Sequence, residues 1–278
     1  MIDLKDFDVN KSEHKLWDNE ESSTVIRYFP AKEKKSDAAI VIFAGGGYKS
    51  RAVHESDGYA EFFSGIGIDS FVVDYRVAPE HFPTQLLDAR RGVRFVRYYS
   101  EKYGIDKEKI AVIGSSAGGH LAALVSTYRS EIEGEGADEI DNECCIPNAQ
   151  ILCYPVISTV DDTIWHRGSG LNLLGEDNLD FAPNVSPDLI ADEKTPQAFI
   201  WHTAADNAVN VINSYSYASA LRRKNVPVEM HIFPNGPHGL GLAKNNKWVG
   251  KCDDKIMSHV CRWADFLEGW LKYIGWLA

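Results

Sequence analysis

The sequence has no excess of basic residues. Its 29 lysines and arginines stand against 40 aspartates and glutamates, which gives a formal net charge of −11 at pH 7. A chain with this net charge repels phosphate backbones and anionic membrane surfaces. We therefore expect neither nucleic acid nor a membrane among its partners.

Cysteine is scarce, and the N-terminus lacks an export signal. The first six residues are polar and acidic, without the basic start and apolar stretch of a secretory signal. Five cysteines in such a chain favour free thiols over disulfides. The spacing of Cys144, Cys145 and Cys153 matches no common zinc pattern. We expect a cytoplasmic protein that needs no metal or cofactor.

One segment without Asp, Glu, Lys or Arg, residues 110–128, is long enough to raise the question of a membrane span. Glycines, serines and a histidine interrupt it between residues 114 and 120, where a helix facing lipid is mostly large and apolar. The segment is therefore predicted to be a strand, a sharp turn and a buried helix.

The length of 278 residues suits one large domain over residues 1–278 and is short for two. Helical spacing of apolar residues occurs at 84–103 and 255–271. Apolar runs rich in β-branched and aromatic residues predict strands at 24–29, 39–43, 70–75, 110–113, 149–153, 198–202 and 228–233. Strands that alternate with helices predict an α/β fold, with a mostly parallel central sheet flanked by helices.

Residues 157–196 break this alternation. The segment contains Pro183, Pro187 and Pro196, several glycines and no clear period. A long irregular stretch inside a compact domain is either functional or disordered. Its position just before a core strand favours a small cap or lid insertion, with a plain loop as the alternative.

The most specific motif is a strand followed by Gly-x-Ser-x-Gly and a helix, with Ser116 at its centre. In such a turn the backbone at the serine is strained, and side chains at Gly114 and Gly118 would collide. The pattern predicts Ser116 as a nucleophile. It also aims the N–H of Ala117 at the negative oxygen that forms when the serine attacks a carbonyl. The alternative is a simple small-residue turn.

Three glycines, Gly45, Gly46 and Gly47, follow the strand predicted at 39–43. Consecutive glycines expose backbone N–H groups with no Cβ in the way. A loop in this position completes the oxyanion hole of enzymes that use the serine turn described above. Phosphate binding is the alternative, but the Gly-x-Gly-x-x-Gly spacing and the Gly-Lys-Ser/Thr ending are missing.

A carboxylate and a histidine follow two later strands. Asp206 comes a few residues after the strand at 198–202, and His238 lies in a glycine- and proline-rich loop after 228–233. A general base needs one ring nitrogen to accept the serine proton and the other to donate to a carboxylate. We assign His238 as base and Asp206 as the acid that orients it. Asp206 could instead cap the helix near residue 210, and His202 is a secondary candidate for the base.

With these motifs, the chain resembles the esterase and lipase branch of the α/β-hydrolases related to hormone-sensitive lipase, and within it the bacterial acetyl esterases of the acetyl-xylan-esterase-like group. The order of nucleophile, acid and base is that of α/β-hydrolases. The resemblance covers about residues 39–243. It depends on Gly45-Gly46-Gly47-Tyr48, Asp74-Tyr75-Arg76, the segment from Gly114 to Ala123, and the segment from Pro227 to Leu240.

The resemblance implies a serine hydrolase that cleaves small carboxylic esters, often acetylated sugars, through an acyl-enzyme. It also implies that the N–H groups of Gly46, Gly47 and Ala117 form the oxyanion hole. Many relatives have histidine before the three glycines, whereas this chain has Ala44. The contacts by which that histidine supports the loop must therefore come from other residues.

Two other functions remain open at this point. An amidase or peptidase on the same fold shares the triad and differs in its pocket. A non-catalytic ligand-binding protein on this scaffold commonly loses a triad member, whereas this chain has all three. Trp165 either stacks on a sugar ring or is a buried residue of the cap. The sequence leaves the oligomeric state open, including a homodimer.

Overall fold

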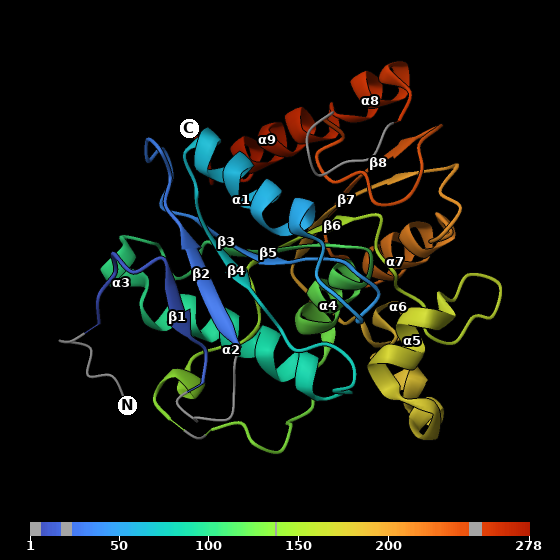
Figure 1. Cartoon of the computed structure of the whole chain (residues 1–278), viewed down its shortest axis with the longest axis horizontal. Helices are drawn as coiled ribbons and strands as arrows, with labels where there is room; N and C mark the ends of the chain where they lie inside the picture. The colour runs from blue at the N-terminus through green and yellow to red at the C-terminus, as the bar shows by residue number, and fades with distance from the viewer. Residues whose placement is uncertain (1–6, 18–23, 137, 245–251) are drawn as a thin grey trace.

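The computed structural model describes residues 7–17, 24–136, 138–244 and 252–278, so the six N-terminal residues used above lie outside the described part. The centre of the molecule is an eight-stranded sheet in the order β1-β2-β4-β3-β5-β6-β7-β8 (Figure 1). Its strands are β1 Glu13–Lys15, β2 Val25–Phe29, β3 Ala39–Phe43, β4 Asp69–Val73, β5 Ile110–Ser115, β6 Ala149–Cys153, β7 Gln197–Thr203 and β8 Val228–Phe233.

The sheet is mostly parallel, which confirms the predicted class. Neighbouring strands from β4 to β8 pair in parallel, whereas β1 with β2 and β2 with β4 pair antiparallel. Every residue of β3 and β5 is buried, because helices cover both faces of a parallel sheet. The strand predicted at 70–75 lies at Asp69–Val73, and β1 was not predicted, since its three residues are polar at an edge.

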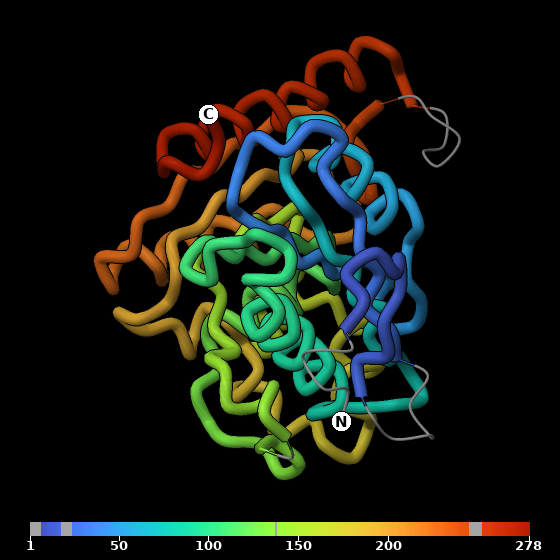
Figure 2. Tube along the Cα trace, turned by 90° about the vertical axis from the view of Figure 1, so that its left-hand side faces the viewer, coloured from blue at the N-terminus to red at the C-terminus, as the bar shows by residue number. Residues whose placement is uncertain are grey.

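Helices cover the two faces and bury two separate apolar clusters. Helices α1, α8 and α9 lie over one face, and α2, α4 and α7 over the other (Figure 1). After a turn of 90°, the C-terminal helices appear in red above the blue-green α2 (Figure 2). Their bounds are α1 Val53–Ile66, α2 Thr84–Tyr98, α3 Ser100–Tyr103, α4 Ser116–Thr127, α7 Ile212–Arg223, α8 Asp254–Val260 and α9 Trp263–Tyr273.

The uncharged segment at 110–128 forms β5 and then α4, and all residues of both elements are buried. The prediction of a strand, a turn and a buried helix is therefore confirmed. In the described part of the chain, every helix is too short or too polar to span a bilayer.

Residues 157–196 contain more regular structure than the sequence predicts. Short helices α5 Arg167–Leu174 and α6 Pro187–Ile190 flank the 3-10 segment η2 Glu176–Val185 in sequence. Both helices pack against η2, and α6 also packs against α7 (Figure 1). Pro183 lies within η2 and Pro187 opens α6, so proline punctuates helical turns that are too short to show a period. The role of the segment as a cap stays a prediction.

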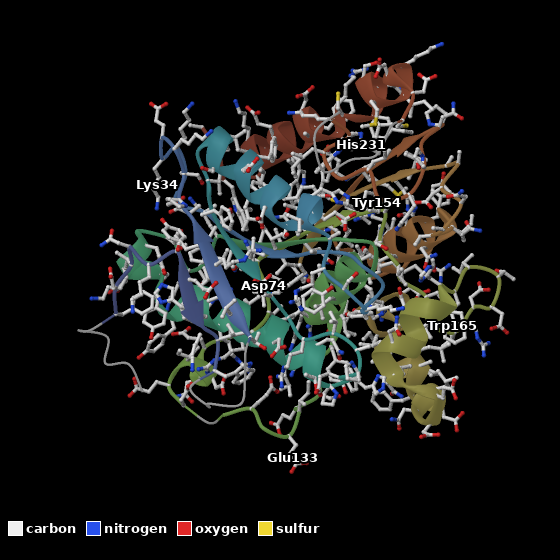
Figure 3. All side chains as sticks on the ribbon, viewed as in Figure 1. Lys34, Asp74, Glu133, Tyr154, Trp165 and His231 are labelled. Carbon is white, nitrogen blue, oxygen red and sulfur yellow. The ribbon has the colours of Figure 1, made fainter. Side chains whose placement is uncertain are left out.

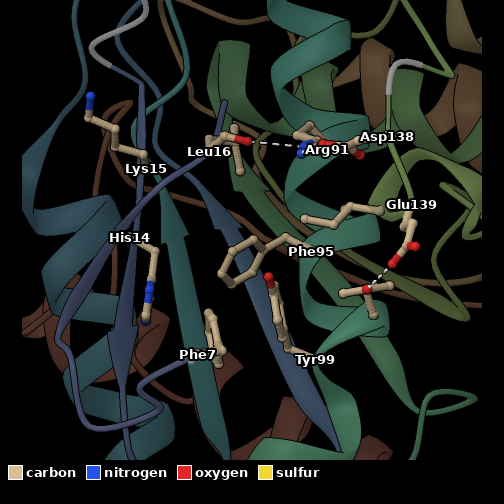
Figure 4. Close-up of a pocket in the computed structure, with 11 residues that line it drawn as sticks. Phe7, His14, Lys15, Leu16, Arg91, Phe95, Tyr99, Asp138 and Glu139 are labelled. Atoms are coloured by element: carbon tan, nitrogen blue, oxygen red, sulfur yellow. Dashed lines mark hydrogen bonds and ion pairs between the residues drawn. The ribbon is translucent and has the colours of Figure 1, made fainter. Parts of the chain in front are cut away.

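A buried arginine fastens the N-terminal segment to helix α2 (Figure 4). Arg91 of α2 is 3% exposed and donates to the carbonyl oxygen of Leu16 at 3.0 Å, to Asp138 at 2.6 Å and to Asp141 at 2.9 Å. Phe7 stacks on Tyr99 nearby, with ring centroids 3.7 Å apart. One guanidinium thus joins three segments that are distant in sequence.

Replacing Arg91 with leucine should destabilise the fold, because it removes the buried cation that donates to Asp138 and Asp141. Breaking a buried pair from one side costs about 3 kcal/mol or more. We expect the free energy of unfolding, measured by urea denaturation, to fall by about that amount. The exposed Arg223→Leu is the matched control. Equal unfolding midpoints for the two variants would contradict the assignment.

Candidate active site

Ser116 lies where β5 ends and α4 begins, in a strained backbone conformation. Its φ is +54°, in the left-handed region that residues other than glycine rarely adopt. A Cβ on Gly114 would lie 2.0 Å from the carbonyl oxygen of Gly118, and one on Gly118 would lie 2.2 Å from that of Phe43. The two glycines are required for the reason expected from the sequence.

The structure brings the three residues predicted to form the triad together. Ser116 Oγ lies 2.8 Å from His238 Nε2, and His238 Nδ1 lies 2.7 Å from Asp206 Oδ2. The side chain of Asp206 is fully buried. Because a carboxylate only accepts hydrogen bonds, Nδ1 of His238 carries the proton and Nε2 is free to accept from the serine. This is the polarity that a general base requires.

Asp206 also closes a backbone turn with its other oxygen. Oδ1 accepts from the N–H groups of Ala208 and Val209, both at 2.9 Å. The alternative expected from the sequence was a helix cap, but α7 begins later, at Ile212. One carboxylate therefore fixes its own loop with Oδ1 and faces His238 with Oδ2.

His202, the secondary candidate for the base, lies against Asp206 rather than Ser116. Its Nε2 is 3.2 Å from Asp206 Oδ2 and 3.0 Å from the carbonyl oxygen of Val209, while Nδ1 is 2.8 Å from Ser214 Oγ. Since both partners of Nε2 are acceptors, that nitrogen carries a proton. His202 therefore acts as a second donor to the carboxylate, a contact that sequence order alone does not reveal.

These donors determine the charge of Asp206. Burial by itself raises the pKa of the carboxyl group, but the hydrogen bonds from His202 and His238 outweigh it. The net effect is a pKa well below the usual range of aspartate. The group is thus anionic beside the imidazole at neutral pH.

The glycine loop contacts the serine turn. A Cβ on Gly45 would lie 3.2 Å from Ser116 Cβ, and Gly46 and Gly47 have φ of +133° and +65°. Within the described residues, the N–H groups of Gly46, Gly47 and Ala117 have no hydrogen-bond partner. Gly46 and Gly47 are partly exposed and Ala117 is buried, and the role of these three N–H groups as oxyanion donors stays a prediction.

Two buried side chains support the peptide between Ala44 and Gly45, at the position where many relatives have histidine. The hydroxyl of Tyr75 donates to the carbonyl oxygen of Ala44 at 2.6 Å, and the N–H of Gly45 donates to Glu55 Oε2 at 2.9 Å. Tyr75 belongs to the Asp-Tyr-Arg motif noted above. Glu55 of α1 carries no sequence signal beyond an acidic residue after the glycine loop.

Helix α5 also contacts this loop. Asn172 Nδ2 donates to the carbonyl oxygen of Gly47 at 2.8 Å. Burial lowers the pKa of His166, which lies next to this helix. Trp165 lies beside α5 (Figure 3), where a Cβ on Gly170 would be 2.4 Å from its Nε1. Gly170 therefore packs against one part of the Trp165 indole ring.

Comparison with known proteins gives consistent matches. The BD-FAE family model matches residues 27–221. The chain is 32% identical over 258 residues to endo-1,4-beta-xylanase B of Butyrivibrio fibrisolvens, covering 87% of this chain and 40% of that protein. It is 30% identical over 237 residues to the acetylxylan esterase of Xylanibacter ruminicola, covering 83% and 46%. The chain thus spans less than half the length of these two relatives.

A solved structure matches nearly the whole chain. The acetyl ester-xyloside bifunctional hydrolase from Caldicellulosiruptor lactoaceticus superposes with a TM-score of 0.85 at 38% sequence identity. The match covers 96% of this chain and 97% of that one.

Replacing Asp206 with asparagine should change how stability depends on pH. A carboxylate whose pKa is lowered by folding contributes stability above its unfolded pKa, about 3.9, and loses it as the pH falls through the folded value. We expect the parent to be more stable than Asp206→Asn at neutral pH, with a gap that narrows below about pH 4. Urea unfolding over this range measures the gap.

The matched control is Asp180→Asn, which removes one negative charge from an exposed position. A gap between the parent and Asp206→Asn that stays constant or widens on acidification would contradict the assignment.

Proposed function

The chain belongs to the BD-FAE family and has the α/β-hydrolase fold, and on that basis we propose that it hydrolyses small carboxylic esters, with acetylated sugars as the substrate class. The observation that carries the proposal is the hydrogen-bonded series from Ser116 through His238 to Asp206. Unpartnered N–H groups beside the serine support it further.

The first half of the reaction forms an acyl-enzyme. Ser116 Oγ attacks the ester carbonyl while His238 Nε2 takes the hydroxyl proton. The carbonyl oxygen becomes an oxyanion and accepts hydrogen bonds from the N–H groups of Gly46, Gly47 and Ala117. His238 then donates its proton to the departing alkoxide, so the C–O bond breaks and the alcohol leaves.

The second half regenerates the enzyme. His238 takes a proton from water, whose oxygen attacks the acyl carbon and forms a second oxyanion in the same hole. Collapse breaks the bond to Ser116 Oγ, which recovers its proton from His238, and the carboxylic acid departs. The anionic Asp206 stabilises the imidazolium in both halves.

The electrostatic contribution of the donors is large because they are fixed before the reaction. One lost oxyanion donor typically costs about 2.7–4 kcal/mol in kcat. At Gly46 and Gly47 the donors are backbone groups in a loop held by Glu55, Tyr75 and Asn172. Little reorganisation is then needed as the negative charge develops.

The proposed substrate class follows the named activities of the relatives. Both an acetylxylan esterase and an acetyl ester-xyloside hydrolase align with most of this chain. Both names combine an acetyl ester with a xylose-based carbohydrate. An acetyl group on a sugar hydroxyl is accordingly the proposed scissile unit.

Replacing Ser116 with alanine should abolish ester hydrolysis while the protein stays folded. Loss of the nucleophile in a serine triad lowers kcat by as much as about 10⁶-fold. We expect turnover of p-nitrophenyl acetate to fall by at least about 10⁴-fold. Ser258→Ala, at an exposed position of α8, is the matched control and should retain the parent rate. Equal turnover by Ser116→Ala and the parent would refute the nucleophile assignment.

A substrate panel tests the proposed class. We expect kcat/KM to be highest for acetylated xylosides, lower for butyryl esters of the same sugars, and lowest for aminoacyl anilides. An amide is a poorer acyl donor than an ester, and an enzyme that cleaves anilides needs a different substrate pocket. Released acetate, butyrate and aniline are measured separately. A preference for the anilides would instead favour the amidase or peptidase alternative.

A further inference from the structure

A buried carboxylate lies next to the proposed oxyanion loop without a role in the steps above. Glu55 is 2% exposed. Its Oε2 accepts from the N–H of Gly45 at 2.9 Å, and its Oε1 accepts from the hydroxyl of Tyr154 at 2.6 Å. Both oxygens therefore face donors, an arrangement that suits the carboxylate form.

Tyr154 extends this contact to the loop that carries His238. It follows β6 with a φ of +37° and lies in the interior of the molecule (Figure 3). Its hydroxyl oxygen accepts from the N–H of Gly241 at 2.8 Å, three residues after His238. Burial and then the Glu55 carboxylate raise the pKa of Tyr154 far above its usual value. The hydroxyl therefore stays protonated and donates a hydrogen bond to Glu55.

A neighbouring histidine makes a parallel contact. His54 Nε2 lies 2.8 Å from the carbonyl oxygen of Gly239 and 3.7 Å from Glu55 Oε1. His54 thus contacts the residue directly after the proposed base, and Glu55 reaches Gly241 of the same loop through Tyr154. The ring of Tyr154 also lies against that of His238, with centroids 5.1 Å apart.

Burying a carboxylate costs free energy unless hydrogen bonds compensate for the lost water. Among the described residues, neither lysine nor arginine forms an ion pair with Glu55. A Cβ on Gly45 would lie 2.3 Å from Glu55 Oε2, so the backbone approaches as closely as it can only because residue 45 is glycine. A larger residue at position 45 would break the hydrogen bond between this backbone N–H and Glu55.

We propose that Glu55 is a positioning residue that ties the oxyanion loop to the loop of His238. The peptide between Ala44 and Gly45 is held at its carbonyl by Tyr75 and at its N–H by Glu55. This fixes the orientation of the backbone that leads into the N–H groups of Gly46 and Gly47. Through Tyr154 the same carboxylate holds the base loop. This inference rests on the proposed esterase function, because it assigns Glu55 to that reaction.

The test replaces Glu55 with glutamine, which keeps the shape but puts an amide NH₂ against either the Gly45 N–H or the Tyr154 hydroxyl. We expect kcat on p-nitrophenyl acetate to fall about 10- to 100-fold, less than for a lost donor, while KM stays within about two-fold because ground-state binding is unaffected. Rates are expressed per active site, counted by complete titration with a phosphonate.

A second readout isolates the oxyanion loop. A boronic acid inhibitor forms a tetrahedral adduct with the serine, so its Ki should rise by the same factor by which kcat/KM falls. A merely structural role would lower the melting temperature and the number of titratable sites, but not the rate per site. Glu61→Gln, on the exposed side of α1, is the matched control and should behave as the parent.

The partner variant Tyr154→Phe should lower kcat in the same way. Combining it with Glu55→Gln should cost less than the product of the two single effects, because the residues act through one contact. If Glu55→Gln does not fold, Tyr154→Phe decides alone. A parent-like kcat per site in either folded variant overturns the proposal, whereas a parent that hydrolyses no ester overturns the proposed function instead.

Discussion

The left-handed backbone at Ser116 is the constraint on which the rest of the site depends. A non-glycine residue in this region costs about 1–3 kcal/mol and persists only where its surroundings hold it. Here β5, the fully buried strand between β3 and β6, leads into the turn, and α4 leads out of it. The N–H of Val156 also donates to the carbonyl oxygen of Ser116 at 3.0 Å. The strained residue is therefore held by the strand before it, by the helix after it and by the hydrogen bond from Val156.

The parallel sheet explains why separate segments meet at that turn. The glycine loop, Ser116, Asp206 and His238 follow β3, β5, β7 and β8, whose carboxyl ends lie on one edge. Two buried carboxylates then set the orientation: Asp206 holds the imidazole, and Glu55 contacts the chain on both sides of the serine. Each carboxylate accepts hydrogen bonds from backbone N–H groups as well as from side chains. The hydrogen bonds that compensate for burying the charge therefore also fix the loops that donate them.

Features that carry a local sequence pattern could be predicted, and side chains without such a pattern could not. The bounds of β3, β6 and β8 and the strand, turn and helix around Ser116 follow from local apolar runs and glycines. The edge strand β1 is too short and polar for such a pattern. Glu55 became visible only in the structure, because its partner Tyr154 lies 99 residues away in sequence. His202, a secondary candidate for the base from the sequence, instead lies against Asp206. The helices of residues 157–196 escaped prediction because each spans only a few turns.

The central claim is that the strained serine is the group that attacks the substrate. The most direct measurement is peptide mass mapping of the full chain after reaction with a fluorophosphonate, which transfers a phosphonyl group to an activated serine. The account predicts one adduct per chain, on the peptide that contains Ser116, formed as esterase activity disappears. An adduct on another residue, or full loss of activity with Ser116 unmodified, would contradict it.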